Sequence, residues 1–167
     1  MDIRIAGTVE DSIVDGPGLR FVVFVQGCPH HCEGCHNPET HDFSAGKLTT
    51  TDALYEMCME NPLCSGVTFS GGEPFCQPKA LYELGSRFKA AGKHLMCYSG
   101  WTFEELLKKS GREEYVGKLL SILDVLVDGR FDISKRSLSL LFRGSSNQRL
   151  IDVPASLTNG EAVELPE

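Results

Sequence analysis

The chain has 167 residues, a length that suits one domain and is sufficient to bury a core without disulfide bonds. Acidic residues outnumber basic ones by 23 to 16, which gives a net charge of −7. This balance argues against a general nucleic-acid-binding protein, which needs a cationic face, and leaves nucleotides and protein partners open.

The chain shows no sign of membrane targeting. No apolar run approaches the roughly 18 residues of a membrane span, and the segment Met1–Arg4 lacks the basic and apolar blocks of a signal peptide. We therefore expect a cytoplasmic protein that does not bind membranes. Seven cysteines are many for a reducing compartment, and an odd number fits a disulfide framework badly. Some of these thiols are therefore expected to be ligands.

Hydrophobic periodicity predicts short strands that alternate with helices. The β-branched and aromatic run at 21–25 indicates a buried strand. The segment 78–91 has proline at its start, apolar residues on one face and glycine after its end, as expected for a helix. The predicted strands are 21–25, 67–70, 94–99, 124–127 and 139–143, and the predicted helices are 49–61, 78–91, 102–110 and 113–123.

This alternation predicts an α/β fold with a parallel sheet and right-handed crossovers. A closed barrel of eight strand–helix units takes about 250 residues, so this chain supplies about five units. We expect an incomplete parallel β/α barrel, open on one side, in a single domain over residues 1–167. The tail from about Ile151 contains two prolines and is expected to be loose.

Each predicted strand is followed by a loop that is rich in glycine or in ligand-type residues. These loops begin at Gly27-Cys28, Gly71-Gly72-Glu73-Pro74, Ser99-Gly100, Asp128-Gly129 and Gly144-Ser145-Ser146-Asn147. In a parallel sheet the loops after the strands lie at one edge, where α/β enzymes place their active sites. We therefore expect the functional site at this edge.

The first of these loops carries three closely spaced cysteines. Cys28, Cys32 and Cys35 have the spacing C-x3-C-x2-C, and thiolates suit iron–sulfur clusters and zinc. Three cysteines would leave one iron of a [4Fe–4S] cluster without a protein ligand, which provides the open position of a catalytic metal. The alternative is a structural zinc site, a non-enzymatic module in which His30, His31 or His36 completes a Cys3His tetrahedron.

Together with Gly71-Gly72-Glu73-Pro74, the cysteine triplet resembles the radical S-adenosylmethionine (SAM) superfamily. The resemblance implies that Cys28, Cys32 and Cys35 bind a [4Fe–4S] cluster whose free iron chelates SAM. It also implies that residues Gly71, Gly72 and Glu73 hold the methionine amino group, and that Gly34, Cys35 and His36 contact the adenine. Many members have an aromatic residue where this chain has Gly34, so packing from that side chain is lost.

Two further segments, 14–20 (Val-Asp-Gly-Pro-Gly-Leu-Arg) and 35–37 (Cys-His-Asn), resemble the activases of glycyl radical enzymes. The structural alternative for Asp-Gly-Pro-Gly is a tight turn before a strand. Segments 97–101, 125–131 and 143–149 resemble the activases that act on anaerobic ribonucleoside-triphosphate reductase. This resemblance implies a radical oxidoreductase whose partner is that reductase and whose electron donor is a protein such as flavodoxin. An activase of another glycyl radical enzyme, such as pyruvate formate-lyase, is the alternative.

The remaining cysteines have no ligand pattern that we recognise. Cys58 and Cys97 fall within a predicted helix and a predicted strand, where buried structural cysteines are the default. With Cys64 and Cys76 added, the spacing of the four remaining cysteines still matches no known cluster-binding pattern. The residues Arg143, Ser145, Ser146 and Asn147 either contact SAM or form a capped turn, and the sequence leaves both interpretations open.

Overall fold

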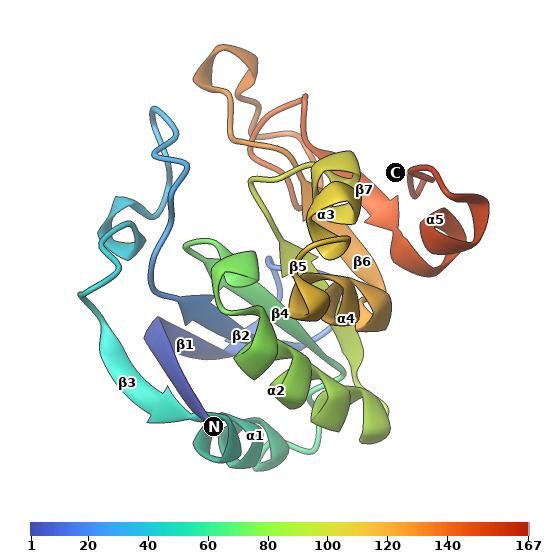
Figure 1. The fold of residues 1–167 in the computed structure, drawn as a ribbon. Helices are drawn as coiled ribbons and strands as arrows, with labels where there is room; N and C mark the ends of the chain where they lie inside the picture. The colour runs from blue at the N-terminus through green and yellow to red at the C-terminus, as the bar shows by residue number, and fades with distance from the viewer. Residues whose placement is uncertain (167) are drawn as a thin grey trace.

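The computed structural model describes residues 1–166, which form one seven-stranded sheet in the order β3-β1-β2-β4-β5-β6-β7 (Figure 1). The strands are β1 (Asp2–Ser12), β2 (Arg20–Val25), β3 (Lys47–Thr50), β4 (Gly66–Gly71), β5 (His94–Tyr98), β6 (Val125–Asp128) and β7 (Arg149–Asp152). The helices are α1 (Thr51–Met59), α2 (Pro78–Ala90), α3 (Phe103–Ser110), α4 (Glu114–Ile122) and α5 (Val153–Asn159), with short 3-10 helices η1 (Pro38–Thr40), η2 (Pro74–Cys76) and η3 (Ile133–Lys135).

The centre of the sheet is parallel and its margins are antiparallel. Strands β2, β4, β5 and β6 pair in parallel, whereas β1 and β3 on one side and β7 on the other run antiparallel to their neighbours. The expectation of an α/β fold with an incomplete, open parallel β/α barrel is therefore confirmed, although four strands and not five pair in parallel. In the part of the chain that the structure describes, no helix has the length and apolar character needed to cross a membrane.

Helices α1 to α4 lie on the same face of the sheet (Figure 1). Each turns an apolar stripe toward the strands, and Leu54, Leu84, Leu106 and Leu119 are buried in the resulting core. Their starts follow local sequence rules: Thr102 and Glu105 form a capping box before α3, and Pro78 opens α2. The other face carries a smaller apolar cluster of Met96, Val125, Val127 and Leu150, beside which Tyr98 and Phe142 pack.

Two expectations about the C-terminal region are corrected by the structure. The segment 139–143 is not a strand but part of a loop, and its residue Leu141 is half exposed. From Ile151 onward the described chain is ordered: β7 pairs with β6, and α5 begins at an Asp152 cap. Ile151 and Val153 are buried because α5 packs beside α4. That residues 1–167 form one domain stays a prediction.

The Asp-Gly-Pro-Gly segment is held in place by Arg20, which is fully buried. The Arg20 guanidinium donates hydrogen bonds to the Pro17 carbonyl (2.8 Å), the Val67 carbonyl (2.7 Å) and the Thr68 hydroxyl (2.8 Å). Gly16 has φ +143°, and a Cβ there would lie 2.7 Å from Arg20 Nε, so glycine leaves the room that the guanidinium occupies. The motif therefore has a structural role at the start of β2.

Candidate functional site

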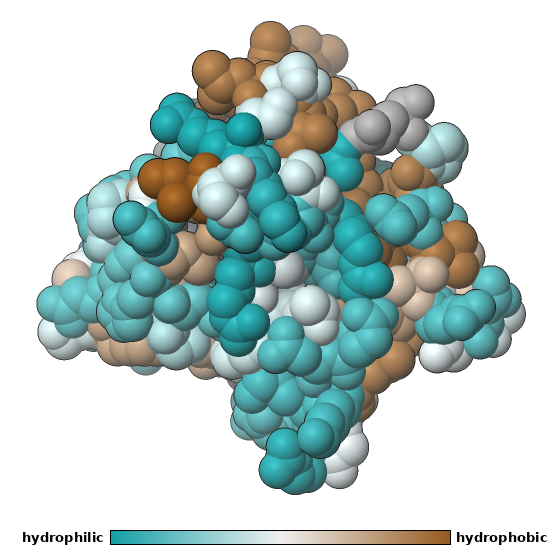
Figure 2. Space-filling model, turned by 90° about the horizontal axis from the view of Figure 1, so that it is seen from above, coloured by the Kyte–Doolittle hydropathy of each residue, from teal (hydrophilic) through white to brown (hydrophobic). Residues whose placement is uncertain are grey.

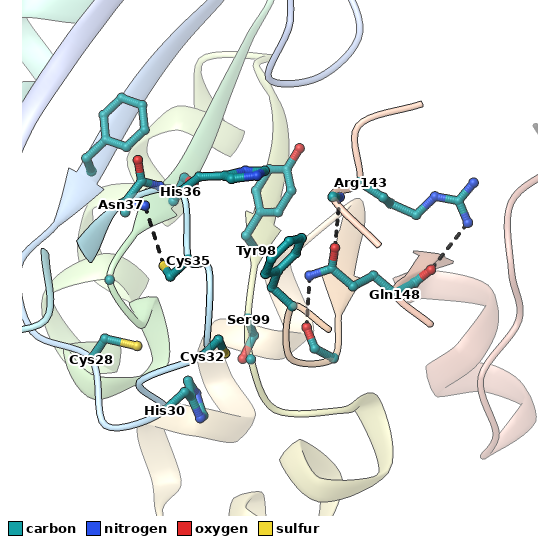
Figure 3. Close-up of a pocket in the computed structure, with 18 of the residues that line it drawn as sticks. Cys28, His30, Cys32, Cys35, His36, Asn37, Tyr98, Ser99, Arg143 and Gln148 are labelled. Atoms are coloured by element: carbon teal, nitrogen blue, oxygen red, sulfur yellow. Dashed lines mark hydrogen bonds between the residues drawn. The ribbon is translucent and has the colours of Figure 1, made fainter. Parts of the chain in front are cut away.

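A cavity of about 520 Å3 opens at the carboxyl ends of the parallel strands, where the sequence predicts the site. This volume is typical of cavities that bind cofactors or small molecules. Figure 3 shows the cysteine loop on one side of the cavity, Arg143 and Gln148 on the other, and Tyr98 between them. Cys28, Cys32 and Cys35 all line the cavity, so the structure brings the three predicted cluster ligands to one place.

The cysteine loop (residues 27–41) follows β2, and backbone hydrogen bonds between its two ends close its base. Gly27 N–H donates to the Thr40 carbonyl (2.7 Å), and Cys28 N–H donates to the His41 carbonyl (3.2 Å). Near its tip, Cys35 N–H donates to the Cys32 carbonyl (3.1 Å), and the Asn37 N–H points at Cys35 Sγ (3.4 Å). These bonds fix the course of the loop, whose three cysteines line the cavity.

The donor set fits an iron–sulfur cluster. Cys28, Cys32 and Cys35 are free thiols on a shared cavity, and each would bind a different iron of a cubane. Burial raises the pKa of Cys28 and of Cys32, so binding a cation is what stabilises their thiolates. Within residues 1–166, no three His, Cys, Asp or Glu side chains are grouped as a site for a single metal ion.

Gly71 and Gly72 also line the cavity; Gly71 packs tightly against the end of β2, and Gly72 against the base of the cysteine loop. Gly71 has φ +94°, and a Cβ there would lie 2.6 Å from the Val25 nitrogen. A Cβ on Gly72 would lie 2.4 Å from the Gly27 carbonyl oxygen. The glycines therefore serve first to let two backbone segments meet, an explanation that the sequence did not supply.

Glu73 differs most from expectation. We expected its carboxylate to attract the SAM ammonium, but the side chain is fully buried and does not line the cavity. The carboxylate accepts hydrogen bonds from His30 Nε2 (2.7 Å), Ser99 Oγ (3.0 Å), Gly100 N–H (2.7 Å) and Phe75 N–H (2.9 Å). The structure thus places Glu73 where it ties together the loops after β2, β4 and β5.

His36 lines the cavity, whereas Gly34 does not, and contact of either residue with adenine stays a prediction. Gly34 has φ +73°, and a Cβ there would lie 2.6 Å from Ile133 Cδ1, so this position packs on the segment after β6. The His36 ring lies against Phe131, with ring centroids 5.0 Å apart. Phe131 was not among the predicted site residues, yet it supplies a flat apolar surface beside the cysteine loop, of the kind that adenine packs on.

The wall opposite the cysteines is formed by the segment 129–148. Gln148 accepts hydrogen bonds from the N–H groups of Gly144 (2.9 Å) and Ser145 (3.2 Å) and donates to the Gly129 carbonyl (3.0 Å). Ser145 is buried, and Asn147 donates to the Arg130 carbonyl (2.8 Å). Both therefore brace the segment, as a capped turn would, whereas Arg143 and Gln148 line the cavity.

Two aromatic residues of this site are not among the site residues predicted from the sequence, which favours a packing or partner contact for Tyr98. Tyr98 lines the cavity at the end of β5, and its hydroxyl donates to the Phe142 carbonyl (2.7 Å). Phe142 also lines the cavity and has φ +57°, a conformation that costs energy for a bulky residue. The alternation of residues along β5 indicates the face of the sheet on which Tyr98 lies, but no local sequence pattern predicts the strained backbone at Phe142.

The four outer cysteines are not part of the cavity wall. Cys58, Cys64 and Cys97 are buried in the core, as expected for Cys58 and Cys97, and Cys58 Sγ lies 3.7 Å from Cys64 Sγ. Burial raises the pKa of Cys76 to about 12, so it remains a thiol at neutral pH. None of the four lines the cavity.

The chain is similar to known proteins over most of its length. The model of the family described as "4Fe-4S single cluster domain" matches residues 14–151, which favours iron–sulfur over zinc. The anaerobic ribonucleoside-triphosphate reductase-activating protein of Enterobacteria phage T4 is 31% identical over 144 residues, 82% of this chain and 86% of that protein. The protein of the same name from Haemophilus influenzae is 34% identical over 146 residues, 81% of this chain and 89% of that protein.

Two further similarities are informative. The pyruvate formate-lyase-activating enzyme of Clostridium pasteurianum is 40% identical over 114 residues, which are 63% of this chain and 48% of that enzyme. The crystal structure of QueE from Escherichia coli gives a TM-score of 0.51 at 17% identity, covering 61% of this chain and 54% of QueE, and supports the fold alone. The chain therefore belongs to the anaerobic ribonucleoside-triphosphate reductase-activating proteins, radical SAM enzymes whose cofactors are a [4Fe–4S] cluster and SAM.

Proposed function

We propose that this chain generates a glycyl radical on an anaerobic ribonucleoside-triphosphate reductase by reductive cleavage of SAM. The observation that carries the proposal is the shared cavity: Cys28, Cys32 and Cys35 line the same open space as the Gly71-Gly72 backbone. A closed site would suit a small substrate, whereas an open one admits a backbone glycine of another protein. The named relatives supply the identity of that protein.

In this proposal Cys28, Cys32 and Cys35 hold the cluster, and Gly71, Gly72, Cys35 and His36 border SAM. When bound, the cofactors supply the one-electron cleavage of the C5′–S bond and the deoxyadenosyl radical that abstracts hydrogen. The chain binds and orients them and excludes water. Burial of Glu73 gives that residue a supporting role instead, in which its carboxylate fixes the loops that carry Cys28 and Ser99.

The aromatic lining of the cavity serves the radical step. Phe24, Tyr98, Phe131 and Phe142 line the space beside the cysteines and keep water and other reactive groups from the abstracting radical. The partner's glycine has no Cβ, so its backbone can approach closely, and the amide groups on either side stabilise the product radical.

The test is to incubate the reconstituted chain anaerobically with SAM, a one-electron reductant and the reductase, and to record the electron paramagnetic resonance spectrum. We expect a doublet, split by the one remaining α-hydrogen of the glycine. The doublet should vanish when the reductase's glycine is replaced by alanine. SAM cleavage without a signal on the reductase contradicts the proposal.

Activation of pyruvate formate-lyase is the second candidate, because the Clostridium pasteurianum enzyme has the higher identity where it aligns. That alignment spans less than half of the longer enzyme, whereas the reductase-activating proteins align over nearly their whole length. The same incubation with pyruvate formate-lyase separates the two candidates. A doublet on pyruvate formate-lyase and none on the reductase makes pyruvate formate-lyase the partner of this chain.

Two finer points belong to the same proposal. The cluster must receive one electron from outside the chain, and a flavodoxin is the donor that the activase resemblance implies. Reduction of the holo chain by photoreduced flavodoxin, followed by its electron paramagnetic resonance signal, tests this donor. We also propose that the protein works in the cytoplasm, in keeping with its seven free cysteines.

A further inference from the structure

A loop beside the cavity has the features of a docking element. Residues 135–146, the docking loop, form a hairpin-like loop with an ordered base: Ser146 N–H donates to the Lys135 carbonyl (2.9 Å) and Ser137 N–H to the Gly144 carbonyl (3.2 Å). The Ser145 hydroxyl, buried beneath, accepts from Asp132 N–H (3.1 Å). The loop is therefore braced although it projects from the end of the sheet (Figure 1).

The tip of the docking loop exposes apolar side chains. Leu138 is 88% exposed and Leu141 is 50% exposed. The backbone at Phe142 has φ +57° and is anchored by the hydrogen bond from the Tyr98 hydroxyl to its carbonyl. Holding apolar residues in water in a strained conformation costs stability, and such features concentrate at interaction sites.

The apolar tip continues into the cavity. Leu140 and Phe142 line the cavity from the docking loop, and Val14 lines it from the turn between β1 and β2. Val14 and its neighbour Ile13 are 73% and 74% exposed. Apolar groups from two segments of the chain therefore line the cavity. Figure 2, which views the molecule from above, shows hydrophobic surface next to hydrophilic surface on this end.

The charge of this region differs from that of the whole chain. Residues 135–146 contain three basic residues and no acidic residue, hence a net charge of +3, in a chain whose net charge is −7. Lys135 and Arg136 are exposed at the base of the docking loop. A basic patch on an acidic protein steers a partner whose own surface is acidic and orients it during encounter.

We infer that the docking loop, together with Ile13 and Val14, binds the protein whose glycine enters the cavity, through an apolar segment of that partner flanked by acidic residues. The inference rests on the proposed function and names its docking surface. Leu140, Phe142 and Val14 line the same space as the cysteines, so a polypeptide that enters the cavity lies beside them.

The test compares two variants with matched controls in the holo chain with SAM and without reductant, so that no radical forms during binding. Leu138→Ser removes the exposed apolar tip, and Leu63→Ser, at a side chain that is 76% exposed before β4, is its control. A second variant reverses the charge of the docking loop with Lys135→Glu and Arg136→Glu. Its control makes the same change in charge at two exposed residues elsewhere, with Lys47→Glu and Arg112→Glu. Affinity for the reductase is measured anaerobically by calorimetry.

We expect Leu138→Ser to weaken binding about tenfold, as for an anchor residue at an interface. The charge reversal should weaken it similarly and flatten its dependence on salt. Both controls should bind like wild type, and all four variants should bind SAM and cleave it normally with a strong reductant, since none of these residues lines the cavity.

Affinity within about twofold of wild type for both test variants overturns the inference. So does binding of wild type to anionic lipid vesicles that these substitutions abolish while reductase binding is kept, because the loop would then be a membrane contact. If wild type itself binds the reductase but installs no radical, the proposed function fails while the docking surface stands.

Discussion

His30 and Glu73 connect the cysteine loop to the loop after β4 through a hydrogen bond of 2.7 Å between Nε2 and Oε1. Their side chains are 5% and 0% exposed. The His30 ring also packs edge-on against Trp101, with centroids 4.7 Å apart, and a Cβ on Gly100 would lie 2.4 Å from its Cδ2. The residue midway between Cys28 and Cys32 is therefore fixed by two other loops, the one after β4 and the one after β5.

Replacing His30 by leucine should loosen the cysteine loop. The substitution leaves the buried Glu73 carboxylate without one of its donors, and an unmet buried polar group costs about 1–3 kcal/mol. We expect lower stability in urea and a reconstituted cluster that loses iron faster to a chelator. His30→Gln places an amide nitrogen near the position of Nε2 and should restore most of both properties. Equal iron loss from both variants would show that the hydrogen bond does not position the loop.

Alanine substitution should separate the cysteines into two classes. Removing Cys28, Cys32 or Cys35 is expected to abolish cluster assembly, because these thiols share the cavity. Removing Cys58, Cys64 or Cys97, which are buried in the core, should leave iron content unchanged. Iron and sulfide analysis with the visible spectrum of the reconstituted protein provides the measurement. Dependence of iron binding on two of the core cysteines would require a second cluster.

Gly72→Ala should impair the cluster as well as SAM binding. The added Cβ would lie 2.4 Å from the Gly27 carbonyl oxygen, at the base of the loop that carries Cys28. We therefore expect low iron content and weak SAM binding together. Gly7→Ala is the control, because a Cβ there meets no atom within 4 Å. Normal iron with lost SAM binding would mean that the loop shifts and that Gly72 acts on the ligand alone.

Alkaline pH should destabilise the fold through Cys58. Burial, and then the neighbouring Cys64 thiol, raise the pKa of Cys58 from 9.0 to about 12. Between these values the unfolded chain releases the Cys58 proton while the folded chain keeps it, so stability falls as pH rises. The slope is about 1.4 kcal/mol per pH unit for this thiol. Urea unfolding at about pH 8 and about pH 10 should show a smaller loss for Cys58→Ala than for wild type.

Much of the architecture follows from periodicity in the sequence. The four parallel strands and helices α1 to α4 lie close to their predicted positions because buried strands and amphipathic helices leave clear patterns. Strands β1 and β3 were missed because Gly7 and Glu10 interrupt β1 and β3 is largely exposed. Helix α5 did carry a signal, an Asp152 cap before Pro154 with Gly160 after the end, that the expectation of a loose tail overlooked.

The candidate site is predictable in its ligand types but not in its side-chain directions. Spacing alone brings Cys28, Cys32 and Cys35 to one edge of the sheet. The burial of Glu73 depends on Ser99 and Gly100, which are more than twenty residues away in sequence, so no local motif reveals it. The predicted strand at 139–143 failed because its apolar residues face the cavity and the solvent instead of a neighbouring strand.

The antiparallel margins of the sheet have a consequence for how this architecture can grow. A further β/α unit appended beyond β7, or inserted beyond β3, would have to pair its strand with a strand that is not part of the parallel series. Duplication of a unit at either end therefore cannot extend the parallel arc toward closure. The parallel part of the sheet thus ends at an antiparallel strand on each side of the barrel's opening. The number of parallel strands can change only if a β/α unit is inserted or lost among β2, β4, β5 and β6.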